Sequence, residues 1–149
     1  MTTRELVSED FQTASALMTS ADGGCRFDQT RAAAFWRRWM VTSTILGTFD
    51  DAGVLYSLRV LDRTKLNRIV RLRAQFHRDA NQDAYTDEMK RSVRGFVAWL
   101  RATGITQVLN LIIPPGQPYP GWLVARLGAV VVGDRVEFTT DALEQSLDP

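Results

Sequence analysis

The sequence contains one cysteine, one histidine and no long run of apolar residues. A single cysteine, Cys25, excludes an internal disulfide and a zinc site built from cysteines, and it fits a reducing compartment. No stretch reaches the roughly eighteen apolar residues that a membrane helix needs, and residues 1–11 (MTTRELVSEDF) have no secretion-signal pattern. We therefore predict a cytoplasmic protein that has no membrane partner and no metal site.

Neither sign of charge dominates the sequence. The chain has 18 Lys and Arg residues against 17 Asp and Glu residues, so its formal net charge is +1 and its overall field gives no reason to expect tight binding to nucleic acid. Repeats and low-complexity linkers are also missing. With 149 residues, 45% of them hydrophobic, the chain is long enough to bury one core, and we predict a single domain over residues 1–149.

Apolar residues recur with the periods of strands and helices, in the order β-α-α-β-β-β-α-β-α-β-β. Residues 68–76 alternate between apolar and polar, which predicts a strand with one apolar face. That face would carry Val70, Leu72, Ala74 and Phe76. Helical spacing predicts a helix that ends at Gly104, and the nearly continuous apolar residues of 105–113 predict a strand covered on both sides.

The junction between that first strand and the helix, residues 77–86 (HRDANQDAYT), contains no glycine. Asp83 or Thr86 is a suitable N-cap, because a side-chain oxygen there accepts a hydrogen bond from the first helical turn. Asp87 and Glu88 follow, where carboxylates stabilise the positive end of the helix dipole. We therefore predict that the junction caps the helix with its own side chains. Its acidic groups would repel an anionic ligand.

The order of the predicted elements resembles the GNAT superfamily of acetyl-CoA-dependent N-acetyltransferases over nearly the whole chain. Three segments are similar to family landmarks: residues 2–11 (TTRELVSEDF), 72–79 (LRAQFHRD) and 125–133 (ARLGAVVVG). The resemblance implies an α/β (α+β) fold, with a central mixed, mostly antiparallel sheet flanked by helices on both faces. It also implies that a cofactor would lie in a V-shaped opening between the strands at 68–76 and 105–113.

The sequence departs from the family at two places. The family's pyrophosphate loop contains glycines, which let the main chain approach the phosphates closely, whereas residues 80–84 here are Ala, Asn, Gln, Asp and Ala. The family's late helix supplies a tyrosine that returns a proton to the leaving thiolate, and Val124 stands there instead. Tyr119 lies nearby in the sequence but would need a shifted loop.

The candidate site residues follow from this resemblance and from the basic region around residues 59–78. If the chain is active, Tyr119 is the candidate acid and His77 the candidate base, with Glu5, Asp62 and Glu137 as further base candidates. Cofactor contacts would come from Phe76, Arg78, Asn81, Gln82, Asp83 and Ala84. A protein or nucleic-acid partner would contact Arg59, Arg68, Arg71 and Arg73.

The sequence leaves three functions open. Because both the glycine loop and the tyrosine are missing, we expect a degenerate GNAT-like domain that binds no cofactor and lacks efficient acetyl transfer. It would serve as a binding or assembly component with a protein partner, like degenerate members found in bacteriophage virions, and would occur in the host cytoplasm or the virion. The first alternative is an acetyl-CoA-dependent N-acetyltransferase with an atypical pyrophosphate loop. The second is binding of nucleic acid or an acidic partner through the basic hairpin.

Overall fold

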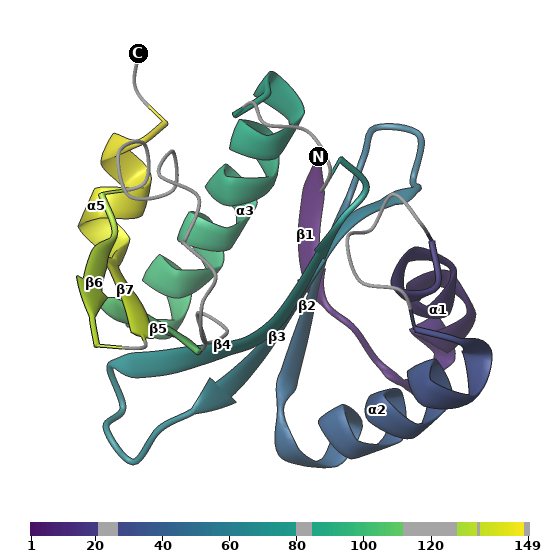
Figure 1. Ribbon diagram of the computed structural model, residues 1–149. Coiled ribbons are helices and arrows are strands. Elements are labelled where there is room, and N and C mark those ends of the chain that lie inside the picture. Colours follow the sequence, from purple (N-terminus) through teal and green to yellow (C-terminus); the bar gives the residue numbers. More distant parts are fainter. Residues whose placement is uncertain (21–26, 80–84, 112–127, 134, 148–149) are drawn as a thin grey trace.

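The computed structural model describes residues 1–20, 27–79, 85–111, 128–133 and 135–147 (Figure 1). In chain order the elements are β1 (Thr2–Glu5), the short 3-10 helix η1 (Ser8–Asp10), α1 (Phe11–Met18), α2 (Gln29–Thr42), β2 (Thr44–Phe49), β3 (Leu55–Arg63), β4 (Ile69–His77), α3 (Asp87–Thr103), β5 (Gln107–Leu111), β6 (Val130–Val132), β7 (Arg135–Thr139) and α5 (Thr140–Gln145). The predicted helix that includes residues 122–127 lies outside the described residues.

The described strands form one seven-stranded sheet in the order β1-β2-β3-β4-β5-β7-β6. Every neighbouring pair is antiparallel except β4 and β5, which are parallel. The helices α1 and α2 cover one face of the sheet, and α3 and α5 cover the other (Figure 1). The predicted fold class, a mixed and mostly antiparallel sheet with helices on both faces, is confirmed.

Helix α3 begins and ends as its sequence predicts. Thr86 is the N-cap, and its hydroxyl accepts a hydrogen bond of 3.1 Å from the backbone N–H of Met89. Asp87 and Glu88 occupy the first turn. The helix ends at Gly104, whose φ of 75° is the left-handed conformation that glycine adopts without steric cost. Of the two N-cap candidates, Thr86 therefore fills the role.

Two buried clusters lie on opposite faces of the sheet. On the α3 side, the strand residues Leu61, Val70, Leu72 and Val108 pack against Val93, Phe96, Val97 and Leu100 of α3. On the other side, Leu58, Val60 and Phe76 pack against Met18 of α1 and Trp36 and Trp39 of α2. Helices therefore pack on both faces of β3 and β4, although Arg73 and Gln75 of β4 remain exposed.

A β-bulge in β4 changes which residues share a face. Val60 of β3 lies opposite Ala74, but the next residue, Leu61, lies opposite Leu72, so Arg73 is an extra residue in the ladder. A one-residue insertion sends every later side chain to the other face of the strand. Val70 and Leu72 consequently join the α3 cluster, whereas Phe76 joins the α2 cluster with Ala74 packed against it. The prediction that all four share one face is wrong for this reason.

Helix α3 approaches β1 most closely at Gly95. A Cβ atom added there would lie 1.9 Å from Oγ1 and 2.9 Å from Cβ of Thr3. The Thr3 hydroxyl is in turn 3.0 Å from the hydroxyl of Thr48 on β2, so it is held in place. Glycine at this position sets how closely the helix can lie on the edge of the sheet.

We expect Gly95→Ala to lower the free energy of unfolding by about 1 to 3 kcal/mol, because overpacking against Thr3 outweighs the roughly 1 kcal/mol that alanine contributes in a helix. Urea denaturation measures this change. The Thr3→Ala substitution in the Gly95→Ala background should recover part of the loss, since it removes the hydroxyl that makes the shortest contact. An unchanged or higher stability of Gly95→Ala would contradict the close approach.

Candidate functional site

Strands β4 and β5 separate before β4 ends. Their last paired residues are Leu72 and Asn110, whereas β4 continues to His77. From Arg73 to His77, no described strand pairs with the β5 side of β4. The backbone N–H and C=O groups on this side of β4 thus have no strand partner in the described part of the chain. This is the place where the sequence resemblance predicts an opening between the two strands.

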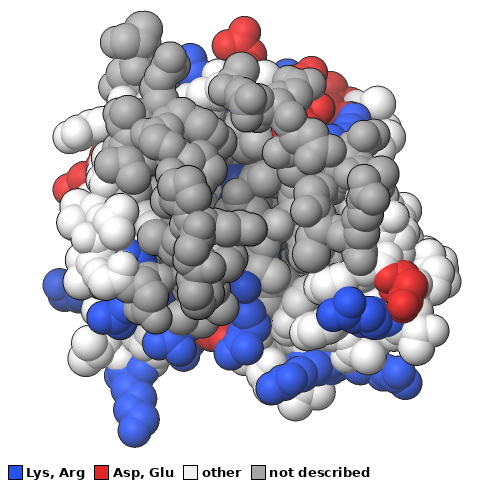
Figure 2. All heavy atoms as spheres, viewed as in Figure 1, with Lys and Arg blue, Asp and Glu red and all other residues white. Residues whose placement is uncertain are grey.

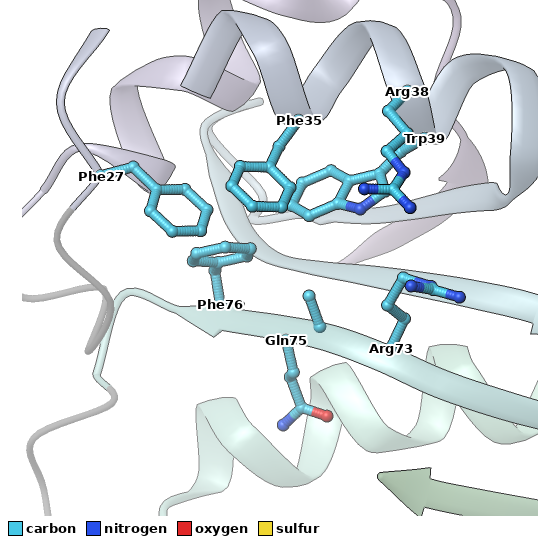
Figure 3. Close-up of a pocket in the computed structure, with 8 residues that line it drawn as sticks. Phe27, Phe35, Arg38, Trp39, Arg73, Gln75 and Phe76 are labelled. Carbon is cyan, nitrogen blue, oxygen red and sulfur yellow. The ribbon is translucent and has the colours of Figure 1, made fainter. Parts of the chain in front are cut away.

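A pocket of about 340 Å³ lies between α2 and this part of β4 (Figure 3). Its walls include the rings of Phe27, Phe35, Trp39 and Phe76. Phe27 and Phe35 are stacked with ring centroids 5.0 Å apart, and Phe76 meets Phe27 edge-on at 5.7 Å. The centroid of Trp39 lies 5.4 Å from that of Phe35 and 6.2 Å from that of Phe76. These contacts make one continuous aromatic wall.

The charges around this pocket are predominantly positive. Arg38 of α2 and Arg73 of β4 line it together with Ala74 and Gln75, and none of the described lining residues is acidic. Arg73 forms an ion pair with Asp62, which also accepts a hydrogen bond from Ser43. The exposed side chain of Arg38 makes no hydrogen bond or ion pair within the described part of the chain. Arg38 therefore supplies the uncompensated positive charge.

On the α3 side of the sheet, Arg59 is buried, with only 2% of its surface exposed. Its Nη1 donates hydrogen bonds to the hydroxyls of Ser57 (3.2 Å) and Ser92 (3.0 Å), and its guanidinium carbon lies 4.8 Å from the ring centroid of Phe96. Burial lowers the pKa of Arg59 to about 10, which still leaves it charged at neutral pH. The prediction that Arg59 contacts a partner is wrong, because α3 covers it.

His77, the candidate base, is buried beside Arg59 and is 5% exposed. Its Nε2 contacts the side-chain amide of Gln75, and its Nδ1 has no hydrogen-bond partner among the described residues. Desolvation, and secondarily the charge of Arg59, lower the pKa of His77 well below its usual value. The imidazole is therefore neutral and a weak proton acceptor, and nothing in its described surroundings orients it as a catalytic base.

Arg78 and Asp79, at the start of the glycine-free junction, contact β3 and the turn after β2. Arg78 pairs with Asp50 at 2.9 Å and lies over the ring of Tyr56, 5.4 Å from its centroid. The Tyr56 hydroxyl donates a hydrogen bond of 2.9 Å to Asp79, and burial, with this contact, raises the pKa of Tyr56. Arg78, a predicted cofactor contact, therefore already has a carboxylate partner.

Several predicted residues lie outside the described part of the chain. These are Cys25, Asn81, Gln82, Asp83, Ala84, Tyr119 and Val124. Phe76, a predicted cofactor contact, faces the α2 pocket because of the bulge, whereas Figure 3 shows Gln75 pointing away from the aromatic wall. The sequence interpretation missed Phe27, Phe35 and Arg38 as pocket residues; the only signal was the concentration of aromatic residues next to arginine in α2.

The remaining candidates are dispersed. Glu5 accepts a hydrogen bond from Trp99, and Glu137 accepts one from Gln107. Arg68 is exposed and Arg71 half-buried, and Lys and Arg side chains gather over the β3–β4 hairpin and α2 in the view of Figure 2. Among the described residues there is no group of three or more potential metal ligands, and no described helix is long and apolar enough to cross a membrane.

Comparison with known proteins identifies the fold. No protein-family model matches the sequence, and no curated protein shows significant similarity to it. Among solved structures, the chain is similar to the aminoglycoside 6'-N-acetyltransferase of Enterococcus faecium (TM-score 0.67, 10% identity, 94% of this chain and 97% of that one). It is also similar to a GNAT family N-acetyltransferase of Escherichia coli solved in complex with CoA (TM-score 0.59, 15% identity, 95% and 83%).

A third similar structure is the spermidine N-acetyltransferase of Vibrio cholerae (TM-score 0.63, 10% identity, 95% of each chain). At these identities the likeness shows that the chain has the GNAT fold. The neighbours are named as acetyltransferases, which contradicts our expectation of a non-acetylating binding or assembly component. The missing glycines misled that interpretation, and the first alternative, an N-acetyltransferase, is the one that these neighbours favour.

The buried, neutral state of His77 has a consequence for stability. Below about pH 6.5, the pKa of an exposed histidine, the unfolded chain takes up a proton that the folded chain does not. We expect this uptake to lower the free energy of unfolding by up to about 1.4 kcal/mol per pH unit as the pH falls. Urea denaturation of the wild type and of His77→Gln at about pH 7.5 and about pH 5.5 isolates this contribution, since the chain has no other histidine. Equal pH dependence in both proteins would contradict it.

The Thr86 cap can be tested separately. We expect Thr86→Ala to lower the free energy of unfolding by about 1 kcal/mol, because the Met89 N–H loses its acceptor. The matched control is Thr86→Ser, which keeps a hydroxyl and should retain most of the stability. Thermal and urea unfolding of the three proteins provide the comparison, and equal losses in both variants would show that the hydroxyl does not cap the helix.

Proposed function

We propose that this protein is an acetyl-CoA-dependent N-acetyltransferase with an atypical pyrophosphate loop. The observation that carries the proposal is that the pairing of β4 with β5 ends at Leu72 while β4 continues to His77, within a fold shared with N-acetyltransferases. The β4 edge from Arg73 to His77 has N–H and C=O groups that no described strand pairs, and such an edge suits an extended ligand that contains amide groups. This edge would hold the cofactor's pantetheine arm.

The junction after β4 would hold the phosphates less firmly than a glycine-rich loop. Asp87 and Glu88 place carboxylates in the first turn of α3, and the guanidinium of Arg78 already pairs with Asp50. An anion at this helix end would therefore meet repulsion that partly offsets the attraction of the helix dipole. We expect binding of acetyl-CoA to be correspondingly weak and to depend more on β4.

When bound, acetyl-CoA supplies an acetyl group on a thioester, and this group moves to the acceptor nitrogen while the CoA sulfur takes up the proton that the nitrogen loses. The protein's own contribution to the acceptor is electrostatic. Arg38 lines the pocket next to β4 with no ion-pair partner among the described residues, and its positive charge would lower the pKa of an amine bound there. A larger fraction of the amine is then in the neutral, nucleophilic form without a dedicated base.

The proposal predicts that acetyl-CoA binds along β4 and that a suitable amine releases free thiol from it. Calorimetric titration measures the binding, and a thiol-reactive dye follows turnover with a panel of amines. Hydrogen exchange tests the location: backbone amides of residues 73–77 should gain protection with acetyl-CoA, while those of β2, which is paired on both sides, should not change. Absence of binding at millimolar acetyl-CoA, or of thiol release with every amine, would overturn the proposal.

A further inference from the structure

We propose that the pocket between α2 and β4 selects a small acceptor amine that carries both an apolar or aromatic group and a carboxylate. The inference rests on the proposed N-acetyltransferase function, and it names the substrate class of that site. The pocket volume of about 340 Å³ is in the range of small-molecule sites and suits a molecule of amino-acid size.

The position of the pocket fits an acceptor. Its floor is formed by residues Arg73 to Phe76, the same stretch of β4 that follows the last pairing with β5. A molecule in the pocket therefore lies on the α2 side of the strand whose edge would present the acetyl group. The two ligands would approach β4 from different directions and meet at its last residues.

The pocket wall determines the apolar part of the acceptor. Trp39 and Phe76 are buried, while Phe27 and Phe35 are half-buried at the pocket, where they stack on each other. In Figure 3 the rings of Phe27, Phe35, Trp39 and Phe76 lie next to one another and form one side of the site. An aromatic or branched aliphatic group that enters removes its own apolar surface and that of the half-buried rings from water.

The charges determine the polar part of the acceptor. Arg73 is neutralised by Asp62, but no described carboxylate neutralises Arg38. In Figure 3, Arg38 and Arg73 both lie toward the end of the pocket away from Phe27. A guanidinium at the rim of an apolar pocket pairs well with a carboxylate, because it offers several N–H donors in one plane.

The same arrangement disfavours a polyamine. Aromatic rings attract cations when their faces are open and the charge is not opposed. Here the rings pack on one another, and the charge of Arg38 would repel a second ammonium group. The pocket therefore discriminates against polycationic amines and in favour of an amine whose carboxylate is bound by Arg38.

The test compares three amines in the absence of acetyl-CoA, so that binding is measured independently of catalysis. Calorimetry or saturation-transfer NMR should show that phenylalanine binds and that phenethylamine, which lacks only the carboxylate, binds about ten-fold or more weakly. Spermidine, the polycationic amine of the three, should not compete with phenylalanine. Equal affinity for phenylalanine and phenethylamine, or competition by spermidine, would overturn the inference.

A pair of variants on one helix turn provides the matched control. Arg37 and Arg38 are adjacent and exposed on α2, but only Arg38 lines the pocket. The Arg38→Glu substitution should weaken phenylalanine binding by about ten-fold or more, whereas Arg37→Glu, with the same change in net charge, should leave it unchanged. Circular dichroism verifies folding, and Arg38→Gln provides a milder change at the same position. Equal effects of the Arg37 and Arg38 substitutions would also overturn the inference.

The outcomes separate this inference from the proposed function. If phenylalanine binds in an Arg38-dependent way but no acetyl transfer occurs, the pocket assignment stands and the enzymatic function fails. If acetyl-CoA is consumed with spermidine in preference to phenylalanine, the enzymatic function stands and the pocket assignment fails.

Discussion

The rest of the site depends on the β-bulge in β4, where Arg73 is an extra residue in the ladder with β3. It places Phe76 against the aromatic residues of α2 and turns Gln75 away from them. The same residue marks the point where pairing with β5 has just ended, at Leu72. The bulge therefore turns Phe76 toward the pocket, and it coincides with the beginning of the edge that no described strand pairs. Bulges bend a strand and re-aim its side chains, and here both effects occur where a reaction centre would lie.

Positive charge lies on both faces of the sheet at this point. Arg59, held by two serine hydroxyls and the face of Phe96, is on the α3 side, and Arg38 and Arg73 are on the α2 side. Burial, and secondarily the charge of Arg59, keeps His77 neutral, and under the proposed function the charge of Arg38 would make a bound amine lose its proton more easily. A site of this kind needs less from a dedicated base, which agrees with the dispersal of Glu5, Asp62 and Glu137 over separate contacts.

Local patterns in the sequence predicted the elements well, because caps, turns and apolar periods are encoded by neighbouring residues. The span of α3, its Thr86 cap and its Gly104 end all follow from such patterns. The bulge could not be predicted, since residues 70–76 alternate without interruption and the register shift arises only from pairing with β3. Arg59 was expected to contact a partner because it belongs to the basic region of the sequence, but the helix that covers it begins only at Asp87 and cannot be placed over it from local patterns. Function was misjudged because lost glycines were given more weight than the order of elements.

The close contact of Gly95 with Thr3 also bears on how the chain is made. Strand β1 is synthesised well before α3, but it pairs with β2 and packs against that helix at Gly95. An ion pair between Arg91 and Asp51 joins the same helix to the turn after β2. During synthesis, then, strand β1 has no complete docking surface until α3, with its contact at Gly95, has also left the ribosome. Until then the backbone N–H and C=O groups of β1 must be hydrated by water. The polar sequence of residues 2–5 (TTRE) suits a strand that stays exposed before it pairs.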